Sequence, residues 1–226
     1  MTTTELQKIL TKLGYPLTID GKFGPASQAA LLKALTDGPD TPLSNKDVDD
    51  AAAALGVSSP KIWAVYDVEA ASNPFMEGRP TILYEPHIFS RLTNHAYDAS
   101  QPTISSKSWN KKLYPGTQQG RWNQLLKATS LNPDAGLSSA SYGGFQILGA
   151  NHKICGYDTP WSFVYSQSRD VRSQLLAFVG FVKGKGLDVA LRKGDWASFA
   201  RGYNGTAYRE NKYDEKLAKA FAKRSK

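Results

Sequence analysis

The sequence has few residues of the kinds that crosslink a chain or bind a metal. Its 226 residues include one cysteine, Cys155, and three histidines. A single cysteine cannot form an internal disulfide, so we interpret Cys155 as a small buried hydrophobic residue. The H-E-x-x-H pattern of zinc enzymes is absent, and His152 is the histidine nearest to Cys155 in the sequence. We therefore predict a protein without a metal or cofactor, and a zinc amidase is disfavoured.

Long apolar runs are also missing. No segment approaches the roughly 20 consecutive apolar residues that a transmembrane helix needs. Residues 1–5, MTTTE, lack the basic flank and the apolar run of a secretory signal. We expect a chain that is made in the cytoplasm and that depends on another component to act outside the membrane.

Little net positive charge is found outside the C-terminal end. Residues 183–226 contain twelve basic and five acidic residues and account for +7 of the net charge of +8, whereas residues 39–182 are balanced. Such a patch suits an anionic polymer, although a basic surface that only aids solubility explains it as well. No nucleic-acid recognition motif accompanies the charge, so we do not expect nucleic acid as a partner.

The composition is that of a folded chain with one sizeable core and a small satellite. Hydrophobic residues make up 41% of the chain and charged residues 21%. The N-terminal part contains two predicted helices separated by the turn-forming residues 20–25, DGKFGP. A segment rich in turn formers follows. We therefore divide the chain into a module of residues 1–38, a linker of residues 39–43 and a larger domain of residues 44–226.

The larger domain is expected to be mainly helical with a small β region. Capping residues and apolar spacing predict helices over residues 47–55 and 60–71, and residues 80–85 form a short β-like run. Further helices are expected over residues 87–93, 120–130, 160–167, 169–184, 187–192, 195–202 and 210–224.

A carboxylate occupies an apolar position in the second of these helices. Ile62, Val65, Tyr66 and Glu69 share one face, at the i, i+3, i+4 and i+7 positions. A carboxyl group on that face is partly stripped of water, which raises its pKa and suits it to general acid catalysis near neutral pH. A structural glutamate at a helix end is the alternative, and position alone does not decide between the two.

Two later segments contain residues that suit a sugar ligand. In residues 141–149, SYGGFQILG, the paired glycines allow a ligand to approach closely and Gln146 can both donate and accept hydrogen bonds. In residues 200–208, ARGYNGTAY, the tyrosines offer flat faces to pyranose rings. A glycine turn before a buried apolar run, and tyrosines that pack in the core, explain the segments equally well when each is taken alone.

The N-terminal module has a recognisable pattern. It consists of Leu6-Gln7, then Gly14-Tyr15, then a DGxFGP turn and an alanine-rich helix. This pattern resembles the peptidoglycan-binding module of cell-wall hydrolases, and the resemblance implies a wall-binding surface at the turn residues Asp20, Gly21, Phe23 and Gly24. The third element of that module is abbreviated here, so a helical cap that docks on the main domain is the alternative.

Four segments of the larger domain form a second pattern, in order. They are LG…AVxxVE ending at Glu69, GRPxILxExHxF at residues 78–89, SxGxFQIxGxNH at residues 141–152, and DWxxFAxxYNGxxYxxNxYDxKL at residues 195–217. Together they resemble the N-acetylmuramidase domain of modular phage endolysins, in the lysozyme-like superfamily. The resemblance implies a mainly α, lysozyme-like α+β fold and an enzyme that lyses bacterial cells. The serine usual after the glutamate is replaced by residues 70–72, AAS.

The resemblance also implies the chemistry. Peptidoglycan would be cut between N-acetylmuramic acid and N-acetylglucosamine, with Glu69 as the catalytic acid. Glu85 is the candidate for a second carboxylate, with a structural ion pair or an acetamido group of the substrate as alternatives. Asp67 lies on the other side of its helix and is discounted. The predicted substrate contacts are Ser141, Tyr142, Gly143, Gln146, Tyr203, Asn204 and Tyr208.

Two other functions are compatible with these residues. A lytic transglycosylase cleaves the same bond and also needs one glutamate, and a glycan-binding protein without catalysis is the second alternative. We expect a monomer whose partner is bacterial peptidoglycan, with anionic wall or outer-membrane polymers as candidate partners of the basic C-terminal region. The resemblance implies synthesis in the host cytoplasm and action on the wall after the membrane has been permeabilised.

Overall fold

Helices make up most of the molecule, as expected. The computed structural model describes residues 1–69 and 73–226. Its α-helices are α1 (Thr3–Lys12), α2 (Pro25–Thr36), α3 (Asn45–Leu55), α4 (Ser59–Glu69), α5 (Pro86–Leu92), α6 (Gln118–Leu131), α7 (Pro133–Ser138), α8 (Pro160–Gln167), α9 (Val171–Gly184), α10 (Asp188–Lys193), α11 (Trp196–Asn204) and α12 (Tyr213–Arg224). Short 3-10 helices are η1 (Lys111–Leu113), η2 (Gly149–Asn151) and η3 (Thr206–Arg209). Within the described ranges, no helix is both long and apolar enough to cross a membrane.

The β structure is small and antiparallel. β1 (Phe75–Met76) pairs with β2 (Arg79–Pro80), and β3 (Ile82–Tyr84), β4 (Ala140–Tyr142) and β5 (Ile147–Leu148) form a sheet in that order. The strand β3 confirms the β-like run expected within residues 80–85. This pairing lays the segment that leads to Glu85 beside the glycine-rich segment that follows β4.

The sequence-based boundaries differ from the structure in a few places. The last helix begins at Tyr213 rather than at residue 210, because residues 210–212 form a turn in which Lys212 adopts a left-handed backbone at φ +53°. The helix α7 was not predicted, since its six residues are too few to show a periodic pattern; Asn132 caps it and Pro133 occupies its first turn. The predicted end of the helix over residues 60–71 lies outside the described residues beyond Glu69.

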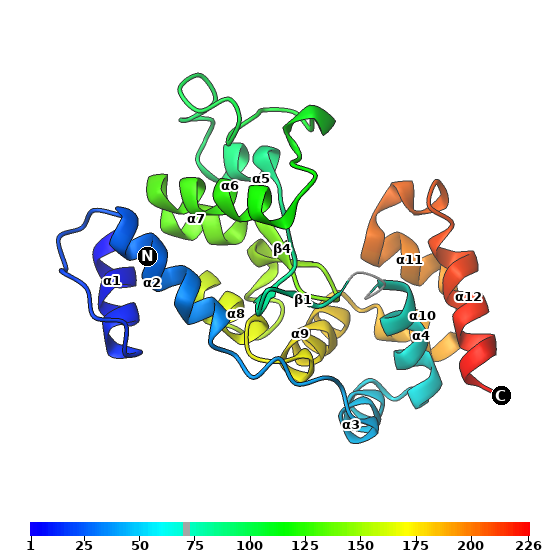
Figure 1. Cartoon of the computed structure of the whole chain (residues 1–226). Helices are drawn as coiled ribbons and strands as arrows, with labels where there is room; N and C mark the ends of the chain where they lie inside the picture. The colour runs from blue at the N-terminus through cyan, green and yellow to red at the C-terminus, as the bar shows by residue number, and fades with distance from the viewer. Residues whose placement is uncertain (70–72) are drawn as a thin grey trace.

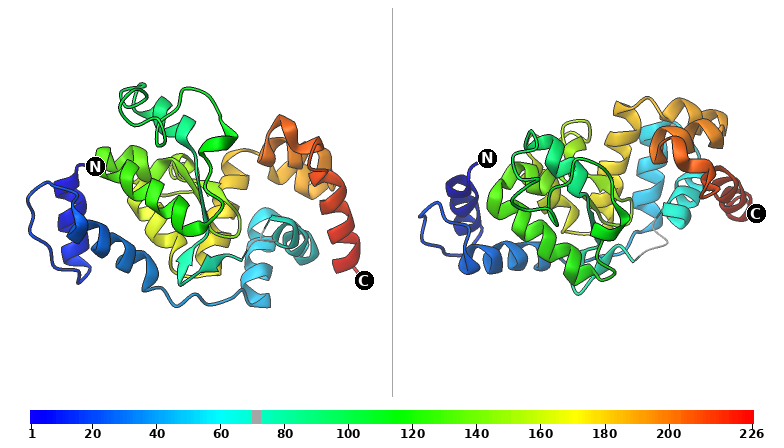
Figure 2. Two further views of the ribbon diagram at one scale, coloured as in Figure 1. Left: turned by 45° about the horizontal axis from the view of Figure 1, so that its top comes forward. Right: turned by 90° about the horizontal axis from the view of Figure 1, so that it is seen from above.

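The core is centred on α9. The aromatic ring of Phe178, which is fully buried, stacks on Phe145 at 4.9 Å between centroids and packs against Tyr203 at 5.8 Å. It thereby joins the β4–β5 region to α11. Figure 1 shows α5, α6 and α7 on one side of α9, and α4, α10, α11 and α12 on the other, an arrangement that the turned views in Figure 2 also show.

The N-terminal hairpin of α1 and α2 lies at the end of the molecule opposite to α12 (Figure 1). Thr2 and Glu5 form a capping box on α1, and Pro25 occupies the first turn of α2, as expected. Gln7 is buried and joins the helix to the turn, because its amide donates to Asp20 Oδ1 at 2.9 Å.

The segment expected as a linker is held against α9 by its backbone. The amide of Asp40 donates to the carbonyl of Arg169 at 3.0 Å, and the amide of Val171 donates to the carbonyl of Thr41 at 3.1 Å. Gly38 fits tightly here, since an added Cβ would lie 2.0 Å from the carbonyl oxygen of Ser168. We call residues 38–41 the strap. Its contacts hold the module on the main body, and the division into domains stays a prediction.

Candidate active site

Glu69 is the last residue of α4 and is largely removed from solvent. Ile62 and Val65 on the same face are fully buried, and Tyr66 packs on Phe145 at 5.8 Å between ring centroids. Burial raises the pKa of Glu69 to about 7, and the positive charge of Lys216 opposes this shift. A carboxylic acid with this pKa is in part protonated at neutral pH and can donate a proton to a bound substrate.

Asn204 reaches Glu69 from the C-terminal end of α11. Its Nδ2 donates a hydrogen bond of 3.0 Å to Glu69 Oε1. On α12, Lys216 Nζ lies 5.4 Å from the centroid of the Tyr213 ring. Burial, and next the negative charge of Glu69, raises the pKa of the Tyr213 hydroxyl. The structure therefore brings the neighbouring helices α11 and α12 to a carboxyl group that lies more than a hundred positions earlier in the sequence.

The packing of α12 against α4 sets this arrangement. Arg224 near the end of α12 makes a two-pronged ion pair with Asp67, at 2.7 Å to Oδ2 and 2.6 Å to Oδ1. The same guanidinium lies 4.9 Å above the ring of Trp63. Asp67 is thus occupied in joining two helices, which agrees with its dismissal as a second catalytic carboxylate.

The side chain of Tyr203 has mainly a structural role at the site. Its hydroxyl donates to the carbonyl of Phe145 at 2.7 Å, and its ring stacks on Phe199 at 5.6 Å between centroids. Burial raises the pKa of this hydroxyl well above its usual value. The hydrogen bond ties the end of α11, where Asn204 begins its approach to Glu69, to the β4–β5 turn.

The glycine-rich turn has a different role from the one predicted. Gly143 adopts φ +70°, and an added Cβ would lie 2.3 Å from the side-chain amide carbon of Gln174. Gln174 Oε1 also accepts a hydrogen bond of 2.7 Å from the amide of Gly144. The close approach that glycine permits is therefore made to Gln174 from α9, and the prediction that Gly143 admits a ligand is wrong.

Gln146 is held at this turn in a strained backbone conformation. Its φ is +47°, and its Nε2 donates to the carbonyl of Gly143 at 2.7 Å and to that of Thr81 at 3.3 Å. Both hydrogen bonds of the Gln146 side-chain amide nitrogen are therefore made within the protein. Ser141 lies next to it in β4, partly exposed and paired with Leu83 and Leu148 in the sheet.

Two of the predicted sugar contacts are buried in the core. Tyr142 is fully buried and its hydroxyl donates to the carbonyl of Leu137 at 2.8 Å. Tyr208 is 5% exposed, and its hydroxyl accepts a hydrogen bond of 3.1 Å from Arg209 Nε. Neither ring presents a flat face to solvent, so the prediction that Tyr208 stacks on a sugar is wrong, and the burial of Tyr142 argues against its predicted contact with the substrate. The alternating burial of a short strand explains Tyr142, because Ala140 on the same side is also buried.

Glu85 belongs to a second hydrogen-bonded group. The hydroxyl of Tyr114 donates to Glu85 Oε2, and His87 Nδ1 lies 3.4 Å from the same oxygen. Burial raises the pKa of Glu85 while the bond from Tyr114 lowers it, and burial lowers the pKa of His87. His87 Nδ1 nevertheless makes no hydrogen bond, and its lowered pKa leaves the ring neutral at neutral pH, so the two groups form no ion pair there. Arg79 pairs with Glu77 instead.

An exposed tryptophan next to this group was not predicted. The side chain of Trp109 is 62% exposed, and its ring lies 5.9 Å from that of Tyr114, which bonds Glu85. Large exposed aromatic faces are common in sugar-binding sites because they combine an apolar face with a polar rim. The available signal was a lone tryptophan in the polar stretch SSKSWNKK.

The predicted wall-binding turn borders a cavity of about 510 Å³. Asp20 and Gly24 line it together with Gln7, Leu17 and Lys22. Gly21 adopts φ +73°, and its amide donates to Gln7 Oε1 at 2.9 Å. Phe23 is 9% exposed and packs in the core of the module, so the prediction that its side chain faces the wall is wrong.

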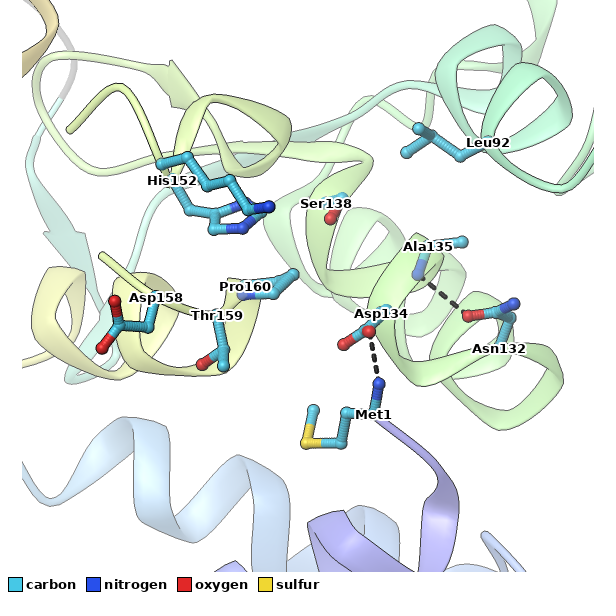
Figure 3. Close-up of a pocket in the computed structure, with 11 residues that line it drawn as sticks. Met1, Leu92, Asn132, Asp134, Ala135, Ser138, His152, Asp158, Thr159 and Pro160 are labelled. Carbon is cyan, nitrogen blue, oxygen red and sulfur yellow. Dashed lines mark hydrogen bonds and ion pairs between the residues drawn. The ribbon is translucent and has the colours of Figure 1, made fainter. Parts of the chain in front are cut away.

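Another cavity, of about 550 Å³, lies between the N-terminus and the helices α7 and α8. Figure 3 shows Asp134, His152, Asp158 and Thr159 around it, with the terminal amine of Met1 paired to Asp134. None of its lining residues belongs to α4, α11 or α12. In the part of the chain that the structure describes, no three His, Cys, Asp or Glu side chains are grouped as metal ligands.

The comparisons with known proteins agree with this geometry. The sequence matches the family model described as N-acetylmuramidase over residues 58–225. The structure is similar to the crystal structure of the Burkholderia AP3 phage endolysin, with a TM-score of 0.76 and 33% sequence identity, covering 99% of this chain and 94% of that one. No curated protein sequence matches the chain significantly. The chain therefore belongs to the N-acetylmuramidase family and is a glycoside hydrolase of peptidoglycan.

Proposed function

We propose that Glu69 is the general acid for cleavage of the bond between N-acetylmuramic acid and N-acetylglucosamine. The observation that carries the proposal is a largely buried carboxyl group with its pKa raised to about 7, held by a neutral amide from Asn204. The proton of Glu69 would pass to the glycosidic oxygen as the bond from that oxygen to the anomeric carbon breaks. The carboxylate left behind can then take a proton from the water that completes hydrolysis.

The substitution Glu69→Gln tests this role. Gln keeps the shape of the side chain and the hydrogen bond from Asn204, but it cannot deliver a proton. General acid catalysis typically contributes roughly 10²–10⁴-fold, so we expect a loss of at least that order on purified peptidoglycan. Asp67→Asn, on the same helix, is the matched control and should retain activity. Near wild-type turnover by a folded Glu69→Gln variant would refute the proposal.

The products distinguish hydrolysis from the competing transglycosylase reaction. Hydrolysis adds water and leaves a reducing end, whereas a lytic transglycosylase leaves an anhydro end that is lighter by one water. We expect reducing ends in the mass spectrum of the released fragments.

For the second catalytic group we propose Glu85. Its support is burial together with hydrogen bonding from Tyr114, a pattern that suits a carboxylate held for use as a base or nucleophile. The acetamido group of the substrate is the competing candidate. Glu85→Gln should lower turnover about as much as Glu69→Gln if Glu85 acts, and much less if the acetamido group does. Its matched control is Glu77→Gln, on the exposed β1–β2 turn.

The substrate contacts that we retain are Ser141, Gln146 and Asn204, with Trp109 added as a platform for a sugar ring. All four are at least partly exposed. Trp109→Ala should raise the KM for soluble glycan by a few-fold, in line with about 0.5–1.5 kcal/mol for aromatic stacking. Trp109→Phe keeps a flat ring and should recover most of this loss.

We propose that residues 1–38 form a wall-binding module, with the cavity beside Asp20 and Gly24 as its binding surface. The resemblance and the cavity support this role. Removal of the module should reduce retention on purified walls and leave cleavage of soluble glycan. Asp20→Asn and Lys33→Gln, which changes an α2 residue outside the cavity, provide the matched pair. Equal retention of all variants on purified walls would show that the module is a structural cap and does not bind the wall.

We also propose that a basic groove along α12 helps the enzyme to bind the cell wall. A groove of about 450 Å³ along α12 is lined by Lys216, Lys219, Lys223 and Arg224, with Asp67 as its one acidic lining residue. Its charge suits anionic wall or outer-membrane polymers. As in the endolysins that it resembles, the protein would be a monomer made in the host cytoplasm that acts after the membrane is permeabilised. Binding to anionic vesicles and polymers that falls steeply with salt is the expected result.

A further inference from the structure

A small cavity lies between the C-terminal end of α11 and η3. Its volume is about 270 Å³, and its lining residues are Arg201, Thr206, Tyr208 and Arg209. Arg201 precedes Asn204 by three residues on α11, so the two side chains lie on neighbouring positions of one helix face. Asn204 itself donates to Glu69, so Arg201 places the cavity about one helical turn from the residue that holds this carboxyl group.

The cavity is positively charged and partly preorganised. Two of its four lining residues are arginines and none is acidic. Arg209 donates through Nε to the buried Tyr208, and its guanidinium lies 5.7 Å from the ring centroid of that residue. This bond orients the guanidinium through Nε and leaves its terminal Nη groups for a ligand. The hydrogen bond with Tyr208 is the largest cause that raises the pKa of Arg209, and Asp214, a smaller one, does not line the cavity.

We infer that this cavity binds a carboxylate of the peptide stem of peptidoglycan, next to the sugar residue being cleaved; the inference rests on the proposed function of Glu69. Guanidinium groups bind carboxylates through paired, charge-assisted hydrogen bonds. The N-acetylated sugars of a stem-bearing glycan strand are uncharged, whereas each peptide stem ends in a carboxylate. A pocket with two arginines beside the catalytic acid therefore selects glycan that carries stems.

The test compares two substrates and two kinds of variant. The substrates are soluble glycan strands with their stems, and the same strands stripped of stems by an amidase and then amidated at the lactyl carboxylates that this hydrolysis exposes. We expect the wild type to cleave stem-bearing strands with the higher kcat/KM. Arg201→Gln and Arg209→Gln should each lower kcat/KM on stem-bearing strands by about ten-fold or more, as for a lost hydrogen bond to a charged group, and should not change it on stripped strands. Lys193→Gln, an exposed charge on α10 outside the cavity, is the matched control.

Binding gives a second readout that does not need turnover. Titration of the Glu69→Gln protein with a disaccharide that carries a free stem, and with the same compound after amidation of its carboxylates, should show weaker binding of the amidated form. The difference should vanish when Arg201→Gln or Arg209→Gln is added. This measurement separates the two ideas, since a carboxylate site can be present in a protein whose Glu69 proves not to be catalytic.

Three results would overturn the inference. The first is an equal loss on stem-bearing and stripped strands in the arginine variants, because the arginines would then act on the sugars or on folding. The second is an equal effect of Lys193→Gln, which would indicate general charge attraction. The third is competition by a soluble phosphodiester wall polymer that is stronger than by free stem peptide and depends on the same arginines, which would assign the cavity to phosphate.

Discussion

At the scale of single residues, Glu69 differs from the nearby Asp67 in the groups that contact its carboxyl group. Its Oε1 accepts a hydrogen bond from the neutral amide of Asn204, and a neutral donor offsets less of the cost of burying a negative charge than a cation in contact would. Asp67, two residues earlier on the same helix, has the opposite environment in its ion pair with Arg224. Two carboxyl groups on one helix therefore have different roles because of their neighbours.

The pH dependence of activity follows from this environment. A general acid works only while it is protonated, so kcat/KM should fall as the pH rises through about 7, the value to which burial raises the pKa of Glu69. Initial rates on soluble stem-bearing glycan across the pH range measure this limb. Activity that keeps increasing above about pH 8 would contradict the assignment.

The same shift makes a prediction about stability. Below the usual pKa of 4.5, Glu69 is protonated in both the folded and the unfolded chain; between 4.5 and about 7 only the unfolded chain releases the proton. The free energy of unfolding therefore falls as the pH rises through this window. Glu69→Gln should be more stable than the wild type at about pH 8, by at most roughly 3 kcal/mol, and equally stable at about pH 4. Denaturant unfolding at both pH values measures the difference, and an unchanged difference would contradict it.

At the scale of elements, α12 tunes the site that α4 carries. It brings Lys216 close enough to Glu69 to oppose the effect of burial on the pKa, while Arg224 fixes the two helices together. The basic residues of this helix thus act on the chemistry as well as on the surface charge.

Removal of the Lys216 charge should shift the pH profile. Lys216→Gln takes away the charge that lowers the pKa of Glu69, so that pKa should rise and the alkaline limb of kcat/KM should move to higher pH. Lys193→Gln removes an equal charge from α10 and should leave the limb in place. A limb that moves to lower pH in Lys216→Gln, or equally in both variants, would show that Lys216 does not act on Glu69.

At the scale of the whole molecule, the strap decides how the N-terminal module is carried. Backbone hydrogen bonds to Arg169 and Val171 hold it, and Arg169 Nη2 also donates to the carbonyl of Ala34 at 2.8 Å. A segment with these contacts resists proteases more than a free linker does, because cleavage requires local unfolding. The N-terminal hairpin of α1 and α2 is therefore held in a defined position relative to the catalytic site.

Gly38 is the point at which this attachment can be broken. In Gly38→Ala the new Cβ would meet the carbonyl oxygens of Ser168 and Arg169, which belong to the backbone and cannot rotate away. We expect detachment of the strap at a cost of about 1–3 kcal/mol and rapid proteolysis within residues 39–43, with peptidoglycan cleavage retained. Gly116→Ala, which adds a Cβ in open space, is the control. Equal proteolysis of both variants would show that the strap does not depend on Gly38.

The sequence by itself determined most of the helices, the apolar face of Ile62 and Val65, and the placement of Glu69 on that face. These features depend on local spacing and capping, which act between residues a few positions apart. For the same reason the turn of residues 20–25 and the basic character of α12 could be read directly from the sequence.

Only the tertiary structure decided which side chains meet. The bond from Asn204 to Glu69 and the approach of Lys216 join residues more than a hundred positions apart, and no local pattern specifies such contacts. Tyr142 and Tyr208 illustrate the limit, because a tyrosine in a short strand or turn is equally suited to the core and to a sugar until the elements that cover it are known. Gly143 illustrates the same limit. A glycine in the sequence indicates that another group comes close to the backbone, but only the tertiary structure showed that this group is the side chain of Gln174.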